Sequence, residues 1–178
     1  MVDRVTEDLD YFTDETSEAV SGLADAVEGA AAPEGLEVQV TQSGHGFVRL
    51  EIRAGQELCQ VDLAHDARIR QQERSEVGPV LALEELGADK VIALFARAEA
   101  RDFVDVRALA RRVGWDRLLA LAAEKDAGFN LSYFLDALRA FDRLPAAEFP
   151  LGGDEYLELR DEVHAWRQQL AGRINDEQ

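Results

Sequence analysis

Two aspartates near the start of the chain, Asp8 and Asp10, have the type and spacing of metal ligands. They lie in a stretch, residues 4–12, whose apolar and polar residues alternate as in a β-strand. Because residues two apart on a strand point to the same side, both carboxylates would share a face, with Thr6 beside them. Carboxylates this close repel one another unless a cation lies between them. The pair therefore suggests a metal site, although a solvated strand edge or a helix-capping cluster would use the same residues.

A third aspartate, Asp62, could complete such a site from a second strand. Its apolar neighbours Val61 and Leu63 take the core-facing parity, so Asp62 is expected to point away from the core. If the two strands are adjacent, three carboxylates converge. Such an oxygen site suits Mg²⁺, which proteins commonly bind through carboxylates together with substrate phosphates. Two such ions can activate an attacking hydroxyl and hold a triphosphate.

A lysine in an apolar helical segment is a further candidate. Lys90, one of two lysines in the chain, lies within residues 83–97, where apolar side chains leave it little polar surface. It must either extend to solvent or meet an anion, and a nucleotide phosphate or a carboxylate such as Asp105 would serve equally well. In the same segment as Asp105, Asp102 could simply be an N-terminal helix residue favoured by the helix dipole. Asp105 lies further into that segment and is better placed for a polar site.

The periodicity of the remaining chain predicts the elements that position these residues. A helix is expected over residues 14–32, capped at Thr13-Asp14 and ended by Pro33 and Gly35. Alternating segments with turns at Ser43-Gly44 and Ala54-Gly55 then predict an antiparallel sheet. The strands of that sheet fall within residues 36–40, 48–52 and 58–63. Beyond Gly78-Pro79, helices are expected over residues 83–97, 102–113, 115–125, 131–143 and about 154–173.

The fold class is therefore α+β, with a small mixed or antiparallel sheet and a flanking helix in residues 1–78, followed by a helical bundle in residues 79–178. The apolar stripe of the last helix, from Tyr156 to Leu170, is expected to pack in the core. A single cysteine, Cys59, cannot form an internal disulfide and indicates a reducing compartment. A charged start without a signal peptide, and no apolar run of membrane-spanning length, predict a cytoplasmic protein.

The formal charge of −17 argues against generic binding to nucleic acid or anionic membranes. The charge is unevenly distributed, because arginines roughly balance acids between residues 68 and 117. Contact with a phosphate backbone is therefore expected in the middle of the chain. Its candidate basic rim consists of Arg68, Arg70, Arg74, Arg97 and Arg101.

Four segments together resemble the AbiEii/MenT family of nucleotidyltransferase toxins. They are residues 4–13 with the Asp-x-Asp pair, residues 61–63, residues 83–94 with Lys90, and residues 101–106 with Asp105. The resemblance implies a polymerase-β-like nucleotidyltransferase fold, with the helical half completing the active-site cleft. It also implies a toxin with a cognate antitoxin protein. Some members transfer an NMP from an NTP to the 3′ end of tRNA.

The resemblance also implies roles for individual residues. Asp8, Asp10 and Asp62 would be Mg²⁺ ligands, and Lys90 would contact the triphosphate. Asp105 would be a further catalytic residue. The predicted nucleotide-binding set is Thr6, Lys90, Arg97, Arg101 and Asp102.

The sequence departs from the family in one respect. The family usually has a Gly-rich turn and helix before the Asp-x-Asp strand, and here only seven residues precede Asp8, so this element is expected to be missing. Without those backbone amides, nucleotide affinity should fall. A second hypothesis is therefore a catalytically impaired protein of this fold that acts as a binding or regulatory partner. A third is an acidic α+β domain whose aspartates are only surface residues.

Overall fold

The computed structural model describes residues 8–176. These residues form two compact units, a sheet unit that ends at Arg68 and a helical unit that begins at Ile69. The predicted α+β class is confirmed. None of the described helices combines the length and the apolar character needed to cross a membrane.

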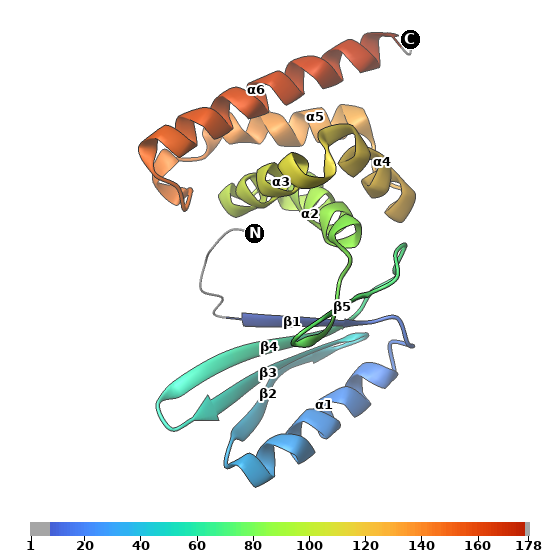
Figure 1. The fold of residues 1–178 in the computed structure, drawn as a ribbon, viewed down its shortest axis with the longest axis vertical. Coiled ribbons are helices and arrows are strands. Elements are labelled where there is room, and N and C mark those ends of the chain that lie inside the picture. Colours follow the sequence, from blue (N-terminus) through green and yellow to red (C-terminus); the bar gives the residue numbers. More distant parts are fainter. Residues whose placement is uncertain (1–7, 177–178) are drawn as a thin grey trace. The chain divides into compact units, whose positions relative to one another are not determined.

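The sheet unit contains four strands in the order β1-β4-β3-β2 (Figure 1). The strands are β1 (Asp8–Thr13), β2 (Glu37–Gly44), β3 (Phe47–Ala54) and β4 (Glu57–His65). Strands β2, β3 and β4 pair antiparallel, whereas β1 pairs parallel with β4. Of the two predicted arrangements, mixed or antiparallel, the structure has the mixed one. A crossover through helix α1 makes β2 run in the direction of β1, and two hairpins return β4 in that direction.

The two hairpin turns come later in the chain than the sequence pattern suggested. They lie at His45-Gly46 and Gly55-Gln56, two residues after the predicted Ser43-Gly44 turn and one residue after the predicted Ala54-Gly55 turn. Gly46 and Gly55 have φ values of 70° and 63°, a left-handed conformation that glycine adopts without steric cost. The alternation in β3 and β4 is therefore uninterrupted up to each turn.

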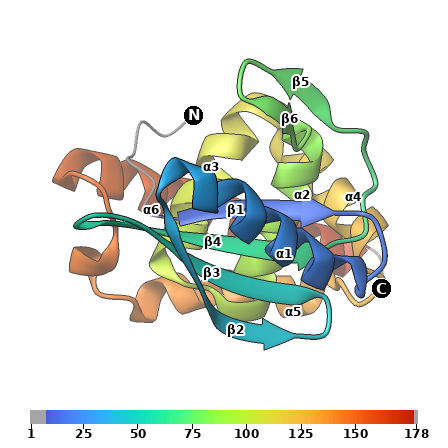
Figure 2. The same ribbon diagram turned by 90° about the horizontal axis from the view of Figure 1, so that it is seen from below.

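Helix α1 (Ala19–Ala31) packs on one face of the sheet (Figure 2). Its buried Val20 and Ala24 contact a cluster formed by the core-facing residues of β3 and β4, Val48, Leu50, Val61 and Leu63. The helix begins later than predicted. Thr13 remains in β1, and its Oγ1 accepts a hydrogen bond from Glu15 N (3.2 Å) in a turn that precedes the helix. The helix ends as expected, in a short turn with Pro33 and a left-handed Gly35.

The helical unit has α2 (Leu83–Arg97), α3 (Ala100–Val113), α4 (Trp115–Lys125), α5 (Leu131–Arg139) and α6 (Gly153–Asp176). The predicted bounds of α2 and α4 are confirmed, and residues 140–143 form a 3-10 turn rather than the end of α5. A short hairpin of β5 (Glu73–Ser75) and β6 (Gly78–Val80) precedes α2. Its three-residue strands were not predicted, because they are too short to give a periodic signal.

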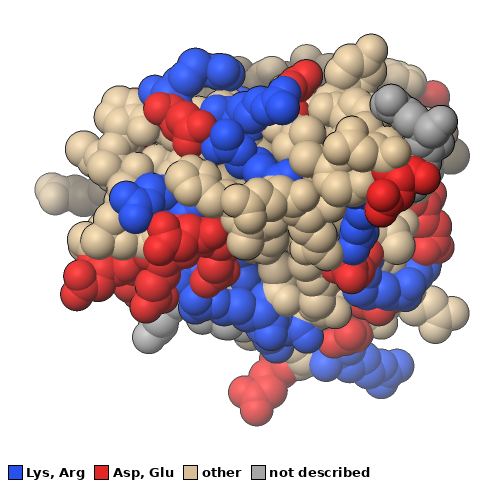
Figure 3. Space-filling model, turned by 90° about the horizontal axis from the view of Figure 1, so that it is seen from above, with Lys and Arg blue, Asp and Glu red and all other residues tan. Residues whose placement is uncertain are grey.

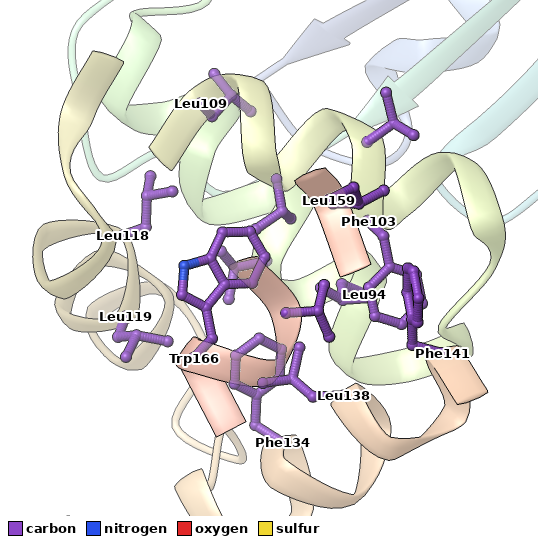
Figure 4. Packing of buried hydrophobic residues seen from close by; sticks show 14 of the residues in the cluster. Leu94, Phe103, Leu109, Leu118, Leu119, Phe134, Leu138, Phe141, Leu159 and Trp166 are labelled. Carbon is purple, nitrogen blue, oxygen red and sulfur yellow. The ribbon is translucent and has the colours of Figure 1, made fainter. Parts of the chain in front are cut away.

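An aromatic and leucine-rich core holds these helices together (Figure 4). The predicted stripe of α6 is buried at Leu159, Val163, Trp166 and Leu170, so its packing role is confirmed. Trp166 stacks on Trp115 with ring centroids 4.3 Å apart. Large aromatic side chains dominate the burial energy of such a core. The helices that carry Lys90 and Asp105 are therefore packed on this core.

Candidate active site

The parallel register of β1 and β4 places the three predicted carboxylates on one face of the sheet. Asp10 lies opposite Asp62, and Asp8 lies opposite Gln60. Residues paired in this way point to the same side, and α1 covers the other side. The condition that the Asp62 strand lies beside the Asp-x-Asp strand is met. Asp8 and Asp10 are exposed, whereas the Asp62 side chain is only 15% exposed.

An arginine that the sequence reasoning missed, Arg49 of β3, lies beside these carboxylates. Its register partner is Asp62. Arg49 Nε donates to Asp62 Oδ1 (2.7 Å) and Nη2 donates to Oδ2 (2.6 Å), a two-pronged charge-assisted pair. The hydrogen bond to Asp62 raises the pKa of Arg49, and the charges of Asp10 and Asp8 add to this rise. Arg49 alternates with the apolar residues Val48 and Leu50 of β3, and this alternation could have placed it on the polar face of the sheet.

The donor set of this face fits a hard divalent cation. Carboxylate oxygens are the ligands that Mg²⁺ prefers, and Asp8, Asp10 and Asp62 supply them from adjacent strands. The Arg49 guanidinium already supplies a counter-charge to Asp62 on this face. These are the residues that could hold a metal ion, and their role as ligands stays a prediction.

In the helical unit, Lys90 of α2 pairs with Asp105 of α3 at 3.0 Å. Of the two anions that could satisfy Lys90, the structure contains the carboxylate. The pair is half-buried, with side-chain exposures of 34% for Lys90 and 18% for Asp105. A lysine held in this way keeps its charge in place while its ammonium group stays accessible to solvent. It can therefore meet a second anion.

Asp102 starts α3 through a capping box with Glu99. Its side chain is fully buried and accepts hydrogen bonds from Glu99 N (3.1 Å) and from Arg97 Nε and Nη2 (2.9 and 2.7 Å). These bonds to Asp102 raise the pKa of Arg97. The contacts of Asp102 are those of a residue at a helix N-terminus, which was one of the two predicted roles. Its contact with a nucleotide stays a prediction.

Arginines of the candidate basic rim pair with acids in the structure. Arg70 contacts Glu84 and Glu124, each at 2.8 Å, and Arg101 contacts Glu99 at 3.1 Å. The face drawn in Figure 3 likewise shows basic groups adjoining acidic groups. Much of the positive charge counted in the sequence is therefore already neutralised. Thr6, the remaining predicted contact, lies outside the described residues.

Comparisons with known proteins agree with this fold. A family model described as the nucleotidyl transferase AbiEii toxin of type IV toxin–antitoxin systems matches residues 1–176. A solved structure of MenT4, a nucleotidyltransferase toxin from Mycobacterium tuberculosis H37Rv, is similar with a TM-score of 0.57. The identity is 17%, and the match covers 92% of this chain and 68% of that chain. No curated protein sequence matches the chain.

These findings define a protein with the nucleotidyltransferase fold. The chain belongs to the AbiEii family of nucleotidyltransferase toxins of type IV toxin–antitoxin systems. The resemblance stated from the sequence motifs is thereby confirmed at the level of family and fold.

Proposed function

We propose that this protein is an active nucleotidyltransferase toxin that moves an NMP from an NTP to an RNA end, the 3′ end of tRNA. The observation that carries the proposal is the register that sets Asp10 opposite Asp62, with Asp8 on the same face. Family membership supplies the reaction class. In this reaction a bond forms between the acceptor hydroxyl and the α-phosphorus, and the bond to the leaving pyrophosphate breaks.

Asp8, Asp10 and Asp62 would hold Mg²⁺ in the sheet unit. Bound Mg²⁺ would neutralise part of the triphosphate charge and would make the acceptor hydroxyl more acidic. The carboxylates of this chain would fix the position of the Mg²⁺ ion, because they belong to two hydrogen-bonded strands rather than to loops.

The helical unit would bind the substrate phosphates. Lys90 would contact the triphosphate, and Asp105 would hold the Lys90 ammonium group in position through their 3.0 Å pair. Arg97 and Arg101 would add nucleotide contacts, with Asp102 fixing Arg97 and Thr6 contributing from the start of the chain. The protein would act in the cytoplasm under the control of a cognate antitoxin.

Transfer of labelled NTP to tRNA with Mg²⁺ tests the proposal. The native chain should label tRNA, and Asp10→Asn should not, while circular dichroism shows both folded. Equal labelling by the two proteins contradicts the assignment of the carboxylates. An unreactive native chain that still binds a partner protein supports the second hypothesis of an impaired, binding protein.

A further inference from the structure

Arg49 occupies both oxygens of a carboxylate that the proposed function assigns to metal binding. The two N–H···O distances to Asp62 are 2.7 and 2.6 Å, and Gln60 Nε2 lies 3.5 Å from the same Oδ1. The pair is half-buried, with side-chain exposures of 35% and 15%. Phe47 supports the guanidinium from β3, with its ring centroid 5.5 Å from Arg49 Cζ. Arg49 is therefore held in place on the carboxylate face.

A guanidinium and a metal ion compete for the same oxygen lone pairs. A side-on arginine uses one lone pair of each carboxylate oxygen, and arginine does not lose its proton in proteins. A divalent cation that binds Asp62 must therefore use the remaining lone pairs beside a fixed positive charge, or displace Arg49. Both routes weaken the binding of a cation that arrives alone.

A nucleotide changes this balance, because it brings negative charge to the same face. The planar fork of arginine fits phosphate as well as carboxylate. A guanidinium that leaves Asp62 can transfer its hydrogen bonds to a phosphate oxygen, so its displacement then costs little.

We propose that Arg49 is a positioning residue that makes metal binding depend on nucleotide: it holds Asp62 while the site lacks metal and releases it when cation and triphosphate arrive together. This inference rests on the proposed function, since it takes Asp62 as a metal ligand. It predicts positive coupling between cation and nucleotide, and it assigns that coupling to one side chain of β3.

The same strand offers a matched control. Arg53 lies on β3 with the same parity but pairs with Glu51 at 2.8 Å, and its register partner is Leu58. Arg53→Gln thus removes the same charge from the same strand and face without touching Asp62. A general effect of net charge would appear in both variants.

The test measures Mn²⁺ binding by calorimetry, with and without a nucleotide whose α,β-bridge is methylene and cannot react. We expect Arg49→Gln to bind Mn²⁺ alone about tenfold more tightly than the native chain. The gain in Mn²⁺ affinity on adding nucleotide should shrink in this variant. Arg53→Gln should match the native chain, and Arg49→Lys should lie between, because lysine keeps the charge but not the fork.

Equal or weaker Mn²⁺ binding by a folded Arg49→Gln overturns the inference. The double variant Arg49→Gln/Asp62→Asn shows whether the effect passes through Asp62: the gain should vanish there, and a gain that persists is a second contradiction. Failure of the proposed function is distinguishable. In that case Asp62→Asn binds Mn²⁺ as the native chain does, whereas failure of the Arg49 inference alone leaves Mn²⁺ binding dependent on Asp62.

Discussion

Asp10 of β1 lies directly opposite Asp62 of β4 in the parallel pair of the sheet unit. Two carboxylates in this relationship repel one another in the absence of a cation. We expect Asp10→Asn to lower transfer by at least about 10²-fold, since removing one transition-state stabilising group costs this much in other enzymes. Melting in EDTA should show a midpoint close to that of the native chain, because Asp10 is exposed and Arg49 already neutralises Asp62.

The control for this prediction is Asp14→Asn, an exposed residue just after β1. It should change neither transfer nor melting. Full activity of Asp10→Asn would remove Asp10 from the site.

The ion pair of Lys90 and Asp105 predicts that substitution of either residue lowers kcat/KM, and by different amounts. Lys90→Met removes the charge that would meet the triphosphate, so kcat/KM for NTP should fall about 10²-fold. Asp105→Asn leaves that charge but frees its position, and we expect a smaller loss, about tenfold. Steady-state kinetics with varied NTP measure both. Arg112→Gln, an exposed substitution on the same helix as Asp105, is the control, and a loss there equal to that of Lys90→Met argues against a specific role.

The buried capping aspartate predicts a loss of stability. Asp102→Ala removes the capping box and the ion pair with Arg97. The Arg97 side chain is 42% exposed, so water can solvate its charge once the pair is lost. The free energy of unfolding in urea should fall by about 2 kcal/mol, the sum expected for a lost cap and a lost charged hydrogen bond. Arg101→Gln, a neighbouring exposed residue, should change it by less than about 0.5 kcal/mol. An unchanged urea midpoint for Asp102→Ala would contradict the structural role of this side chain.

Acid should destabilise the helical unit through Glu84. Hydrogen bonds from Arg117 and Arg70 lower the pKa of Glu84 from 4.5 to about 2. Because the pKa of Glu84 is lower in the folded state, its ionised form stabilises the folded protein at pH values above the pKa of the unfolded chain. This contribution is lost as the pH falls through about 2. Helical circular dichroism in urea, followed from pH 6 downward, should show the native chain losing stability below about pH 4.5 more steeply than Glu84→Gln. Glu148→Gln, at an exposed position, should keep the native pH profile.

Two glycines in the helices should respond oppositely to alanine. A Cβ at Gly87 of α2 would lie 2.4 Å from Cδ2 of buried Leu118, whereas a Cβ at Gly172 of α6 meets nothing within 4 Å. Alanine gains roughly 1 kcal/mol in helix propensity at either position. Overpacking costs about 1–3 kcal/mol at Gly87, so Gly87→Ala should lower the free energy of unfolding and Gly172→Ala should raise it. Stabilisation by Gly87→Ala in urea unfolding would show that Leu118 adapts at no cost.

The sequence by itself determined the α+β class, the family and most of the helices. Helix α2 was predictable because its apolar spacing repeats over several turns, and the side of Asp62 followed from the parity of Val61 and Leu63. These features depend on residues near one another in the chain, which is why a single sequence carries them.

Only the tertiary structure decided which strands are neighbours and which charges meet. Strand pairing joins segments far apart in the chain, so the register pairing of Asp10 with Asp62 had no local signal, and the parity of Arg49 gave its face but not its partner. The same holds for Lys90, whose choice of Asp105 depends on how α2 packs against α3. Periodicity assigns a side chain to a face, but its partner is fixed by the packing of distant elements, and the carboxylates of the candidate site depend on that packing.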